Sequence, residues 1–251
     1  MEEELYSELR SIEHVHWWLV VRRRLFIRFL RQAAARIGHS PLVLDCGFGT
    51  GALMCDLREF ARPVGADMSR QAAVDCRTLG HGYVVQAMAE RLPFLRSTFE
   101  MVCAFDVLEH LEDDAAALDQ WYDLLKPGGH LFLSVPAYKC LWDAQDELAN
   151  HKRRYTLFEL RRKLAKANFR ISKATYFNTA LFPMVVLVRL FKKIGYLLAP
   201  GRVERSDFSF TPPGRVNDLL LRIFASEIGY LERSNFPFGG SIFCIATRSG
   251  N

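Results

Sequence analysis

The sequence contains no apolar segment long enough to cross a membrane and no recognisable export signal. Its longest apolar run, from Ala180 to Val188, is interrupted by Pro183 and ends at Arg189, well short of the ~20 residues that span a bilayer. The first residues, MEEELYSELRS, are acidic and polar, whereas a secretory signal begins with basic residues and continues with an apolar stretch. We therefore expect a cytoplasmic protein, with contact at a membrane surface left open.

Cysteine does not follow the spacing of a zinc finger or of a disulfide framework. No C-x-x-C pair is present, and most of the cysteines lie in apolar surroundings, which indicates reduced core thiols and no bound metal. The six residues are Cys46, Cys55, Cys76, Cys103, Cys140 and Cys244. Glycine and proline, at 16 and 10 residues, are too scarce for a fibrous or low-complexity chain.

The composition is that of an ordinary globular protein. Half of the 251 residues are hydrophobic and 24% are charged, so disorder of the whole chain is excluded and a core can form without disulfides. The formal net charge of +5 permits an anionic partner without requiring one. A single domain suits this length.

Short apolar segments alternate with segments of helical periodicity along the chain. The expected strands lie at 42–44, 64–66, 83–85, 101–105, 130–135, 169–174 and 240–248. Strands separated by helices form parallel βαβ units whose sheet is covered on both faces. The expected fold class is therefore α/β, with a mostly parallel sheet flanked by helices.

The clearest local signal is the segment VLDCGFGTG at 43–51. An apolar strand leads into a Gly-x-Gly-x-Gly turn and then a helix. Glycines there let the backbone approach a ligand, and the helix offers free N–H groups. The segment lacks the G-x-x-x-x-G-K-[ST] pattern of a P-loop, which disfavours ATP hydrolysis. Taken alone, the turn is also compatible with a purely structural connection.

A carboxylate at the end of the second expected strand adds to this signal. Asp67 lies 20 residues after Gly47. A carboxylate in that position can accept hydrogen bonds from both hydroxyls of a ribose, as in dinucleotide-binding folds. The alternative is that Asp67 only caps the helix that follows.

Four blocks, in this order, resemble the class I S-adenosylmethionine-dependent methyltransferases, in particular the broad group related to the ubiquinone/menaquinone-biosynthesis methyltransferases. They are LDCGFGTG (44–51), GADMS (65–69), ERLPF (90–94) and FDVLEHLED (105–113), the last leading to LLKPGGHLFLSVP (124–136). The resemblance implies a Rossmann-like, seven-stranded sheet, S-adenosylmethionine as the cofactor, and methyl transfer as the activity.

The same resemblance assigns the cofactor to residues that follow the first four strands. Its amino-acid part is assigned to Asp45 with Gly47, Gly49 and Gly51, and its ribose to Asp67. Its adenine is assigned to Met68, Ala89 and Glu90. The crevice beyond the fourth strand is assigned to Asp106 with Val107. Members of the group often carry an aspartate where this chain has Met88. Recognition of the adenine amino group is therefore left to backbone groups or to Gln86.

An acceptor oxygen or nitrogen must lose a proton during methyl transfer, and a neutral histidine is the usual base. His110, just beyond the fourth strand, is the first catalytic candidate, although it can instead only shape the pocket. His151, in the basic segment NHKRRY at 150–155, is the second, with Tyr155 as a substrate contact. A solvated basic loop is the alternative for that segment.

The expected domain has four regions. Residues 1–40 form an N-terminal helical cap, 42–136 the cofactor-binding core, 137–215 a substrate loop and lid, and 216–251 a C-terminal helix and strand. Within the lid, residues 178–202 mix apolar and basic side chains, which also suits packing on the core or contact with an anionic membrane. Its aromatic residues favour an apolar or aromatic substrate, and they are Tyr176, Phe177, Phe182, Phe191, Phe208 and Phe210.

The cap supplies two further substrate candidates, His16 and Trp17. Related chains open with a similar His-Trp-Trp…Arg-Arg segment, in which the helix covers the cofactor pocket. We expect one of Trp17 and Trp18 to anchor the helix on the core and the other to face the pocket. The alternative is that both anchor the helix while Arg22 to Arg24 face water.

The sequence therefore predicts methyl transfer to an oxygen or nitrogen, with carbon as a further option, of a small or medium-sized organic molecule. Two other classes remain. One is a methyltransferase acting on RNA or protein, although no RNA-binding motif is present and the Asn/Asp-Pro-Pro-aromatic motif of base N-methyltransferases is absent after the fourth strand. The other is a protein that binds the cofactor without catalysis. The oligomeric state is left open.

Overall fold

Seven strands form one sheet in the computed structural model, which describes residues 3–80, 82–198 and 211–250. The strand order is β3-β2-β1-β4-β5-β7-β6. β1 to β5 run parallel, and β7 runs antiparallel to both β5 and β6. The predicted α/β class with a mostly parallel, Rossmann-like sheet is confirmed. The strands are β1 Leu42–Cys46, β2 Arg62–Asp67, β3 Tyr83–Gln86, β4 Phe99–Phe105, β5 Leu125–Pro136, β6 Phe169–Phe177 and β7 Ser241–Arg248.

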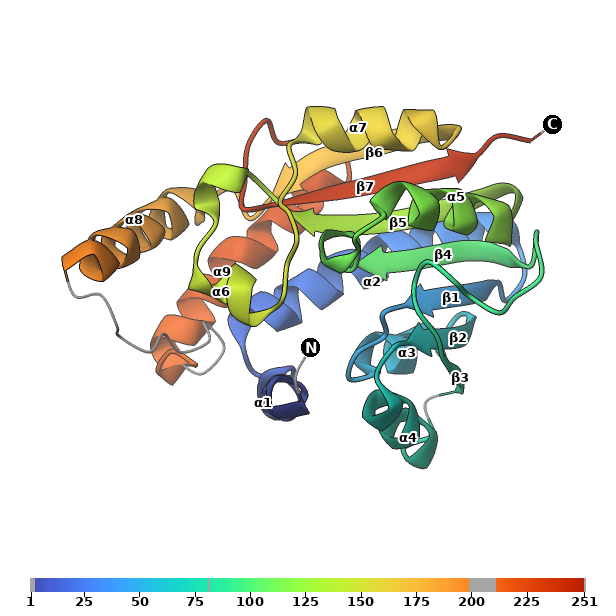
Figure 1. Ribbon diagram of the computed structural model, residues 1–251, viewed down its shortest axis with the longest axis horizontal. Coiled ribbons are helices and arrows are strands. Elements are labelled where there is room, and N and C mark those ends of the chain that lie inside the picture. The colour runs from blue at the N-terminus through green and yellow to red at the C-terminus, as the bar shows by residue number, and fades with distance from the viewer. Residues whose placement is uncertain (1–2, 81, 199–210, 251) are drawn as a thin grey trace.

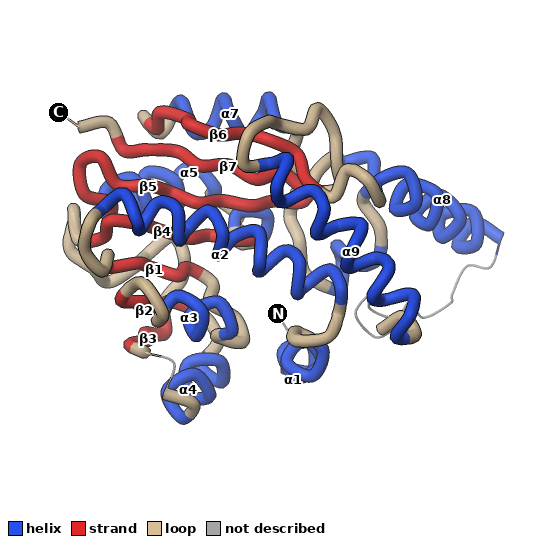
Figure 2. The backbone as a smooth tube through the Cα atoms, turned by 180° about the vertical axis from the view of Figure 1, so that it is seen from behind, coloured by secondary structure: helices blue, strands red, loops and turns tan. Residues whose placement is uncertain are grey.

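Helices cover both faces of the sheet (Figures 1 and 2). One face packs against α5 and α7, and the other against α2, α3 and α9. The α-helices are α1 Glu3–Ile12, α2 Trp17–Ile37, α3 Ala52–Leu57, α4 Arg70–Thr78, α5 Asp114–Leu124, α6 Ala144–Leu148, α7 Leu157–Lys166, α8 Phe182–Leu198 and α9 Gly214–Leu231, and the 3-10 helices are η1 Leu108–His110 and η2 Lys139–Leu141.

Two segments differ from the expectation. Residues 137–158, expected to be a loop, contain η2 and α6. α6 begins with a capping box in which the Asp143 and Asp146 side chains each accept a backbone N–H, a local arrangement that stabilises even a short helix. The KPGG segment, expected to separate α5 from the fifth strand, lies within β5. Gly128 there adopts a φ of +79°, and the β4–β5 register shifts between Phe99 and Met101.

Helix α8 extends outward beyond the carboxyl ends of the parallel strands (Figure 1). Arg189 ties it to the α6 region, because its guanidinium donates to the Leu141 carbonyl at 2.7 Å and lies 2.5 Å from an Asp143 carboxylate oxygen. Many apolar side chains of α8 are nevertheless exposed, Leu187 by 53% and Phe191 by 68%. Phe208 and Phe210, also expected in the lid, lie outside the described residues. No helix in the described ranges is long and apolar enough to cross a bilayer.

Helix α2 is the longest helix in the described part of the chain and anchors the N-terminal segment on the sheet. Its inward face includes Leu25 and Leu30, both fully buried, and Phe26, whose ring lies 3.8 Å from that of Phe105 and 5.6 Å from that of Phe243. Gly38 ends the helix in a left-handed conformation with a φ of 80°, as is common at helix C-termini.

Replacement of Leu25 by alanine is expected to lower the free energy of unfolding by about 2–5 kcal/mol, because it leaves a cavity between α2 and the sheet. Leu95 is 83% exposed, so Leu95→Ala is the matched control and is expected to change stability by less than about 0.5 kcal/mol. Urea denaturation of both variants checks this prediction. Equal losses of unfolding free energy in Leu25→Ala and Leu95→Ala would contradict the packing of α2 on the sheet.

Candidate active site

The carboxyl ends of β1, β2 and β4 meet at one edge of the sheet, the position at which ligands bind in open α/β sheets. The glycine turn follows β1, Asp67 ends β2, and Asp106 follows β4. Since β1 lies between β2 and β4, three segments far apart in the sequence come together there.

The glycine turn has a backbone that only glycine adopts without strain. The φ angles of Gly47, Gly49 and Gly51 are +73°, +57° and +84°. A Cβ atom on Gly47 would approach Cγ2 of Val107 to 2.5 Å, whereas one on Gly49 would meet nothing within 4 Å. Gly47 therefore allows the turn to pack on the segment after β4, and Gly49 leaves space beside the turn.

Asp67 connects β2 to this turn. One carboxylate oxygen accepts the backbone N–H of Gly49 at 3.0 Å, and the other accepts that of Ser69 at 2.8 Å. The N-cap of α4 is Ser69, whose hydroxyl accepts the N–H of Ala72, so capping is not the main role of Asp67. The Asp67 carboxylate thus joins the end of β2 to the glycine turn and to the start of α4.

Asp45 is a buried carboxylate at the end of β1, 3% exposed. Its Oδ2 atom has no hydrogen-bond partner among the described residues. Burial, and secondarily the charge of Asp67, raises the pKa of Asp45 to about 7. A buried carboxylate without a donor is costly, so this position suits a cationic or hydrogen-bonding group of a ligand.

The ERLPF segment is held against α5. The indole N–H of Trp121 donates to the Ala89 carbonyl at 3.1 Å, and Gln120 bonds both backbone groups of Leu92. Ala89 and Glu90 are half-buried. Met68, which follows the end of β2, is 66% exposed and is available to cover a flat ring.

Gln86, considered for the adenine amino group, donates its amide to the carbonyl of Met68 at 3.1 Å. Met88, at the position where an aspartate is common, is 56% exposed.

The N-terminal helices reach this edge through two polar contacts. Arg22 of α2 pairs with Asp106, whose other oxygen accepts the Ser134 hydroxyl at 2.8 Å. The hydroxyl of Thr50, in the glycine turn, donates to Glu13. Arg22 therefore does not face water, as the alternative for this segment supposed, because its guanidinium pairs with Asp106.

His110 and His151 lie side by side, although 41 positions separate them. Their ring centroids are 4.7 Å apart and their planes make an angle of 79°. His151 Nδ1 lies 2.7 Å from an Asp146 oxygen, and its Nε2 lies 4.0 Å from Oε1 of the fully buried Glu109. Burial and the neighbouring His151 lower the pKa of His110 to about 4, so His110 is neutral at neutral pH.

Sequence reasoning missed Glu109 and Asp146, the two acids that flank these histidines. Glu109 adjoins His110 between two leucines that are themselves buried, and this apolar setting was a usable signal. Asp146 lies in a segment that was expected to be an irregular loop.

Tyr155 lies in the core. It is 1% exposed, and its hydroxyl donates to Asp114 at 2.8 Å; Asp114 also pairs with Lys163 at 2.7 Å. Burial and the Asp114 charge raise the pKa of Tyr155. This buried position favours a structural role for Tyr155, and its contact with a substrate stays a prediction.

Trp17 and Trp18 both pack against the core that contains Phe224. The Trp18 ring stacks on Phe224 at 5.2 Å, and the Trp17 ring meets it edge-on at 6.0 Å. The backbone N–H of Trp17 donates to Asn217, and His16 is 5% exposed. These contacts anchor the start of α2 on α9, and a pocket role for His16 and Trp17 stays a prediction.

Aromatic rings gather beyond the ends of β5 and β6. Tyr138 stacks on Tyr176 at 5.2 Å, and Phe182 lies 5.7 Å from Tyr138 and 5.8 Å from Phe238. Tyr138 adopts a φ of 56°, a conformation uncommon for a bulky residue. Phe182 thus belongs to an aromatic group at the carboxyl end of the sheet.

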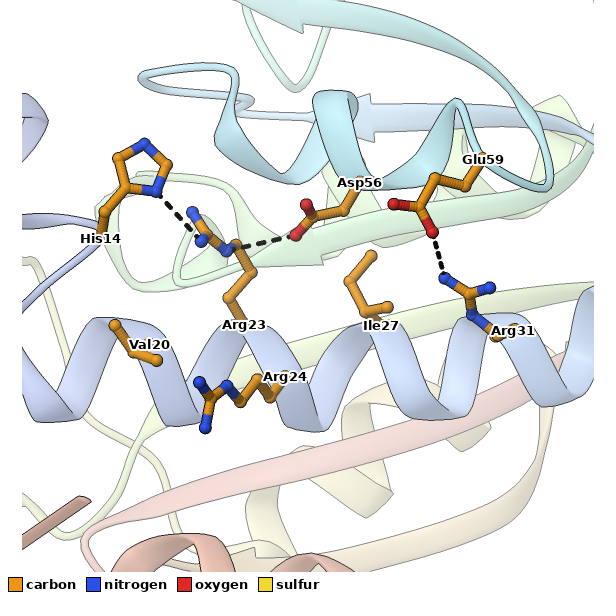
Figure 3. Close-up of a pocket in the computed structure, with 8 residues that line it drawn as sticks. All are labelled: His14, Val20, Arg23, Arg24, Ile27, Arg31, Asp56 and Glu59. Carbon is orange, nitrogen blue, oxygen red and sulfur yellow. Dashed lines mark hydrogen bonds and ion pairs between the residues drawn. The ribbon is translucent and has the colours of Figure 1, made fainter. Parts of the chain in front are cut away.

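A separate surface cavity of about 320 Å³ lies between α2 and α3 (Figure 3). Ion pairs cross it, between Arg23 and Asp56 at 3.2 Å and between Arg31 and Glu59 at 2.6 Å. None of the predicted cofactor or catalytic residues lines it. Both of its acids are already paired with arginines, so the edge with the unpartnered Asp45 oxygen is the better candidate site.

Comparisons with known proteins match the segments that form this edge. Residues 44–133 match a family model described as a methyltransferase domain. The chain is 35% identical over 103 residues to a ubiquinone biosynthesis O-methyltransferase of Ralstonia nicotianae, covering 37% of this chain and 42% of that protein. It is 32% identical over 145 residues to a ubiquinone/menaquinone biosynthesis C-methyltransferase of an Enterobacter species, covering 51% and 56%. The chain thus spans about half the length of these curated relatives.

Among solved structures, the fold resembles a Thermotoga maritima protein described as a SAM-dependent methyltransferase and possible histamine N-methyltransferase. The TM-score is 0.59 at 18% identity, with 97% of this chain and 98% of that chain covered. This likeness supports the fold.

S-adenosylmethionine is the cofactor that this domain and fold imply, and the residues present fit it. The Asp67 carboxylate lies at the glycine turn, where a carboxylate can accept from ribose hydroxyls, the unpartnered oxygen of Asp45 suits the amino-acid ammonium, and Gly49 leaves space beside the turn. These three observations belong to the ligand-free chain and do not depend on the resemblance.

Replacement of Asp67 by asparagine is expected to weaken S-adenosylmethionine binding roughly 10- to 100-fold, because a hydrogen bond to a charged group contributes about 1.5–3 kcal/mol. Asp119 is exposed on α5, so Asp119→Asn is a charge-matched control that is expected to bind normally. Calorimetric titration of both variants measures the difference. Normal S-adenosylmethionine binding by Asp67→Asn would contradict the assignment of the ribose to Asp67.

Replacement of Asp45 by asparagine is expected to stabilise the ligand-free chain most at high pH. The folded-state pKa of about 7 lies above the ordinary value of 3.8, so the ionised form opposes folding, and its penalty grows between these two values and levels off above pH 7. The full shift corresponds to roughly 4 kcal/mol. Urea denaturation of both chains between pH 4 and 8 tests this, and a constant difference would contradict it.

Proposed function

We propose that this chain, which carries a class I S-adenosylmethionine-dependent methyltransferase domain, is an enzyme that transfers a methyl group to an oxygen or nitrogen of a small or medium-sized apolar or aromatic molecule, with carbon as a further option. The observation that carries this proposal is one sheet edge that combines a fitting cofactor site with a pair of neighbouring histidines.

The main catalytic contribution expected of this chain is to position the two reacting groups. The bound cofactor supplies a methyl group already activated by the positive charge of its sulfonium. The glycine turn, Asp45 and Asp67 would hold the cofactor, and the segment after β4 would hold the acceptor. Holding two reacting groups in line can lower a barrier by roughly 7–11 kcal/mol in favourable cases.

His110 and His151 are the proposed groups that receive the acceptor's proton. His110 is neutral near pH 7 because burial lowers its pKa to about 4, and a neutral imidazole can accept a proton. Asp146 fixes the orientation of the His151 ring through the 2.7 Å contact to Nδ1. His110 ends η1, which comes after β4, and His151 comes after α6. We expect the methyl group near these two rings, at the carboxyl edge of the sheet.

The aromatic group of Tyr138, Tyr176, Phe182 and Phe238 favours an apolar or aromatic acceptor. Such rings offer apolar area and edge-to-face contacts to a planar molecule. The curated relatives named above are described as ubiquinone-biosynthesis methyltransferases, and this description supports the same class of acceptor. Helix α8, with its exposed apolar side chains, is proposed as the outer wall of this region, and its contact with a membrane surface stays a prediction.

The alternatives are an enzyme acting on RNA or protein and a protein that only binds the cofactor. Methyl-tritiated S-adenosylmethionine, incubated with the chain and a size-sorted cell extract, distinguishes them. Label in the low-molecular-weight organic fraction is the expected result. Label in RNA or protein would overturn the small-molecule proposal, and cofactor binding without label in any fraction would support a non-catalytic protein.

Replacement of His110 by alanine is expected to lower kcat about 10²- to 10⁴-fold, the usual contribution of a positioned acid or base, and to leave cofactor affinity within about 2-fold. His39→Ala is the control, since His39 is exposed and outside the site, and full activity is expected for it. Turnover of an acceptor found in the labelling experiment, with calorimetry of the cofactor, gives both quantities. Full turnover by His110→Ala would remove this residue from the mechanism.

A further inference from the structure

We propose that Glu109, His110 and His151 bind a divalent metal ion. Each of the three offers one ligand atom, and these atoms all lie within 4.8 Å of one another. Two of them are consecutive at the end of η1, and the third follows α6. The sequence-based expectation of no metal relied on spacing along the chain, which does not reveal a set assembled from two segments.

The first argument is the state of Glu109. It is 0% exposed, and neither carboxylate oxygen has a hydrogen-bond partner in the described part of the chain. A carboxylate sealed from water needs a proton, a donor or a cation, because an unpaired charge in such a place is strongly unfavourable. The nearest basic atom is His151 Nε2 at 4.0 Å from Oε1, beyond hydrogen-bond distance. A cation between these atoms would satisfy both.

The second argument is independent and comes from the hydrogen bonds of His151. His151 uses Nδ1 to contact Asp146 at 2.7 Å, and Asp146 is itself held by the Arg154 guanidinium at 2.7 Å. Metal-binding histidines characteristically use one ring nitrogen for a carboxylate or backbone group, which fixes the ring, and the other for the metal. His151 already has the first of these bonds, and its Nε2 is the atom nearer Glu109.

The donor set indicates the class of ion. Two imidazole nitrogens and one carboxylate oxygen suit Zn²⁺, Fe²⁺, Mn²⁺ or Co²⁺, whereas Mg²⁺ and Ca²⁺ prefer oxygen ligands throughout. Three protein ligands leave coordination positions open, as in catalytic rather than structural zinc sites.

An acceptor oxygen could occupy one of those open positions. Coordination would lower the pKa of a bound hydroxyl, and its proton would pass to water; with the ion bound, the two histidines would act as metal ligands in place of the proton-accepting role proposed above. This last step rests on the proposed function, whereas metal binding itself does not.

The direct test uses the untagged full chain, stripped with EDTA and titrated calorimetrically with Zn²⁺. One ion per chain is expected. Glu109→Gln and His151→Gln are each expected to weaken binding at least about 100-fold, beyond the 10- to 100-fold typical of lost supporting contacts. His39→Ala is the matched control and is expected to bind as the unchanged chain does. Absence of one-to-one binding, or unchanged affinity in Glu109→Gln, would overturn the proposal.

Two further measurements keep the test decisive if a variant folds poorly. X-ray absorption of the Zn²⁺-loaded unchanged chain is expected to show two imidazoles in the coordination shell, and a sulfur-containing or all-oxygen shell would overturn the site. S-adenosylmethionine titration of Glu109→Gln is expected to give normal affinity. A chain that binds Zn²⁺ through two imidazoles but ignores S-adenosylmethionine would uphold this site and refute the proposed function.

Discussion

The hydrogen bond from the Gly49 backbone to Asp67, 3.0 Å long, is the constraint on which the candidate site depends. It fixes the glycine turn after β1 against the end of β2. On the other side, Gly47 brings the turn against Val107, where a Cβ atom would be 2.5 Å from Cγ2. Because β1 is the strand between β2 and β4, the two contacts make one surface from three strand ends. The backbone conformation and the packing of the turn require glycine whether or not a ligand is bound.

Buried charge is concentrated at this edge. Asp45 and Glu109 each have at least one carboxylate oxygen without a hydrogen-bond partner in the described ranges, whereas buried polar groups elsewhere are mostly paired. Asp114, for example, is equally buried and is satisfied by Tyr155 and Lys163. Asp143 and Glu227 also have a buried oxygen without a partner within the residues that the structure describes, so the ligand assignments at this edge rest on the combined geometry. The proposed positions of the cofactor's ammonium, at Asp45, and of the metal ion, at Glu109, are separate.

The sequence predicted the sheet well because strands buried on both faces are apolar runs that turn residues separate, and β1 and β4 follow this pattern most closely. It also predicted the glycine turn and Asp67, since their requirements are local. It failed where the structure depends on distant partners. The pairing of Arg22 with Asp106, the core position of Tyr155, and the meeting of His151 with Glu109 all join segments whose proximity only the folded topology defines. Helix α6 was missed because a short helix fixed by its cap lacks a measurable apolar period.

A crystal structure of the full chain with S-adenosylhomocysteine would test the central claim most directly. The account predicts both ribose hydroxyls within hydrogen-bond distance of the Asp67 carboxylate and the amino-acid ammonium beside Asp45. A nucleoside bound instead in the cavity between α2 and α3, or a glycine turn that touches no part of the ligand, would contradict it.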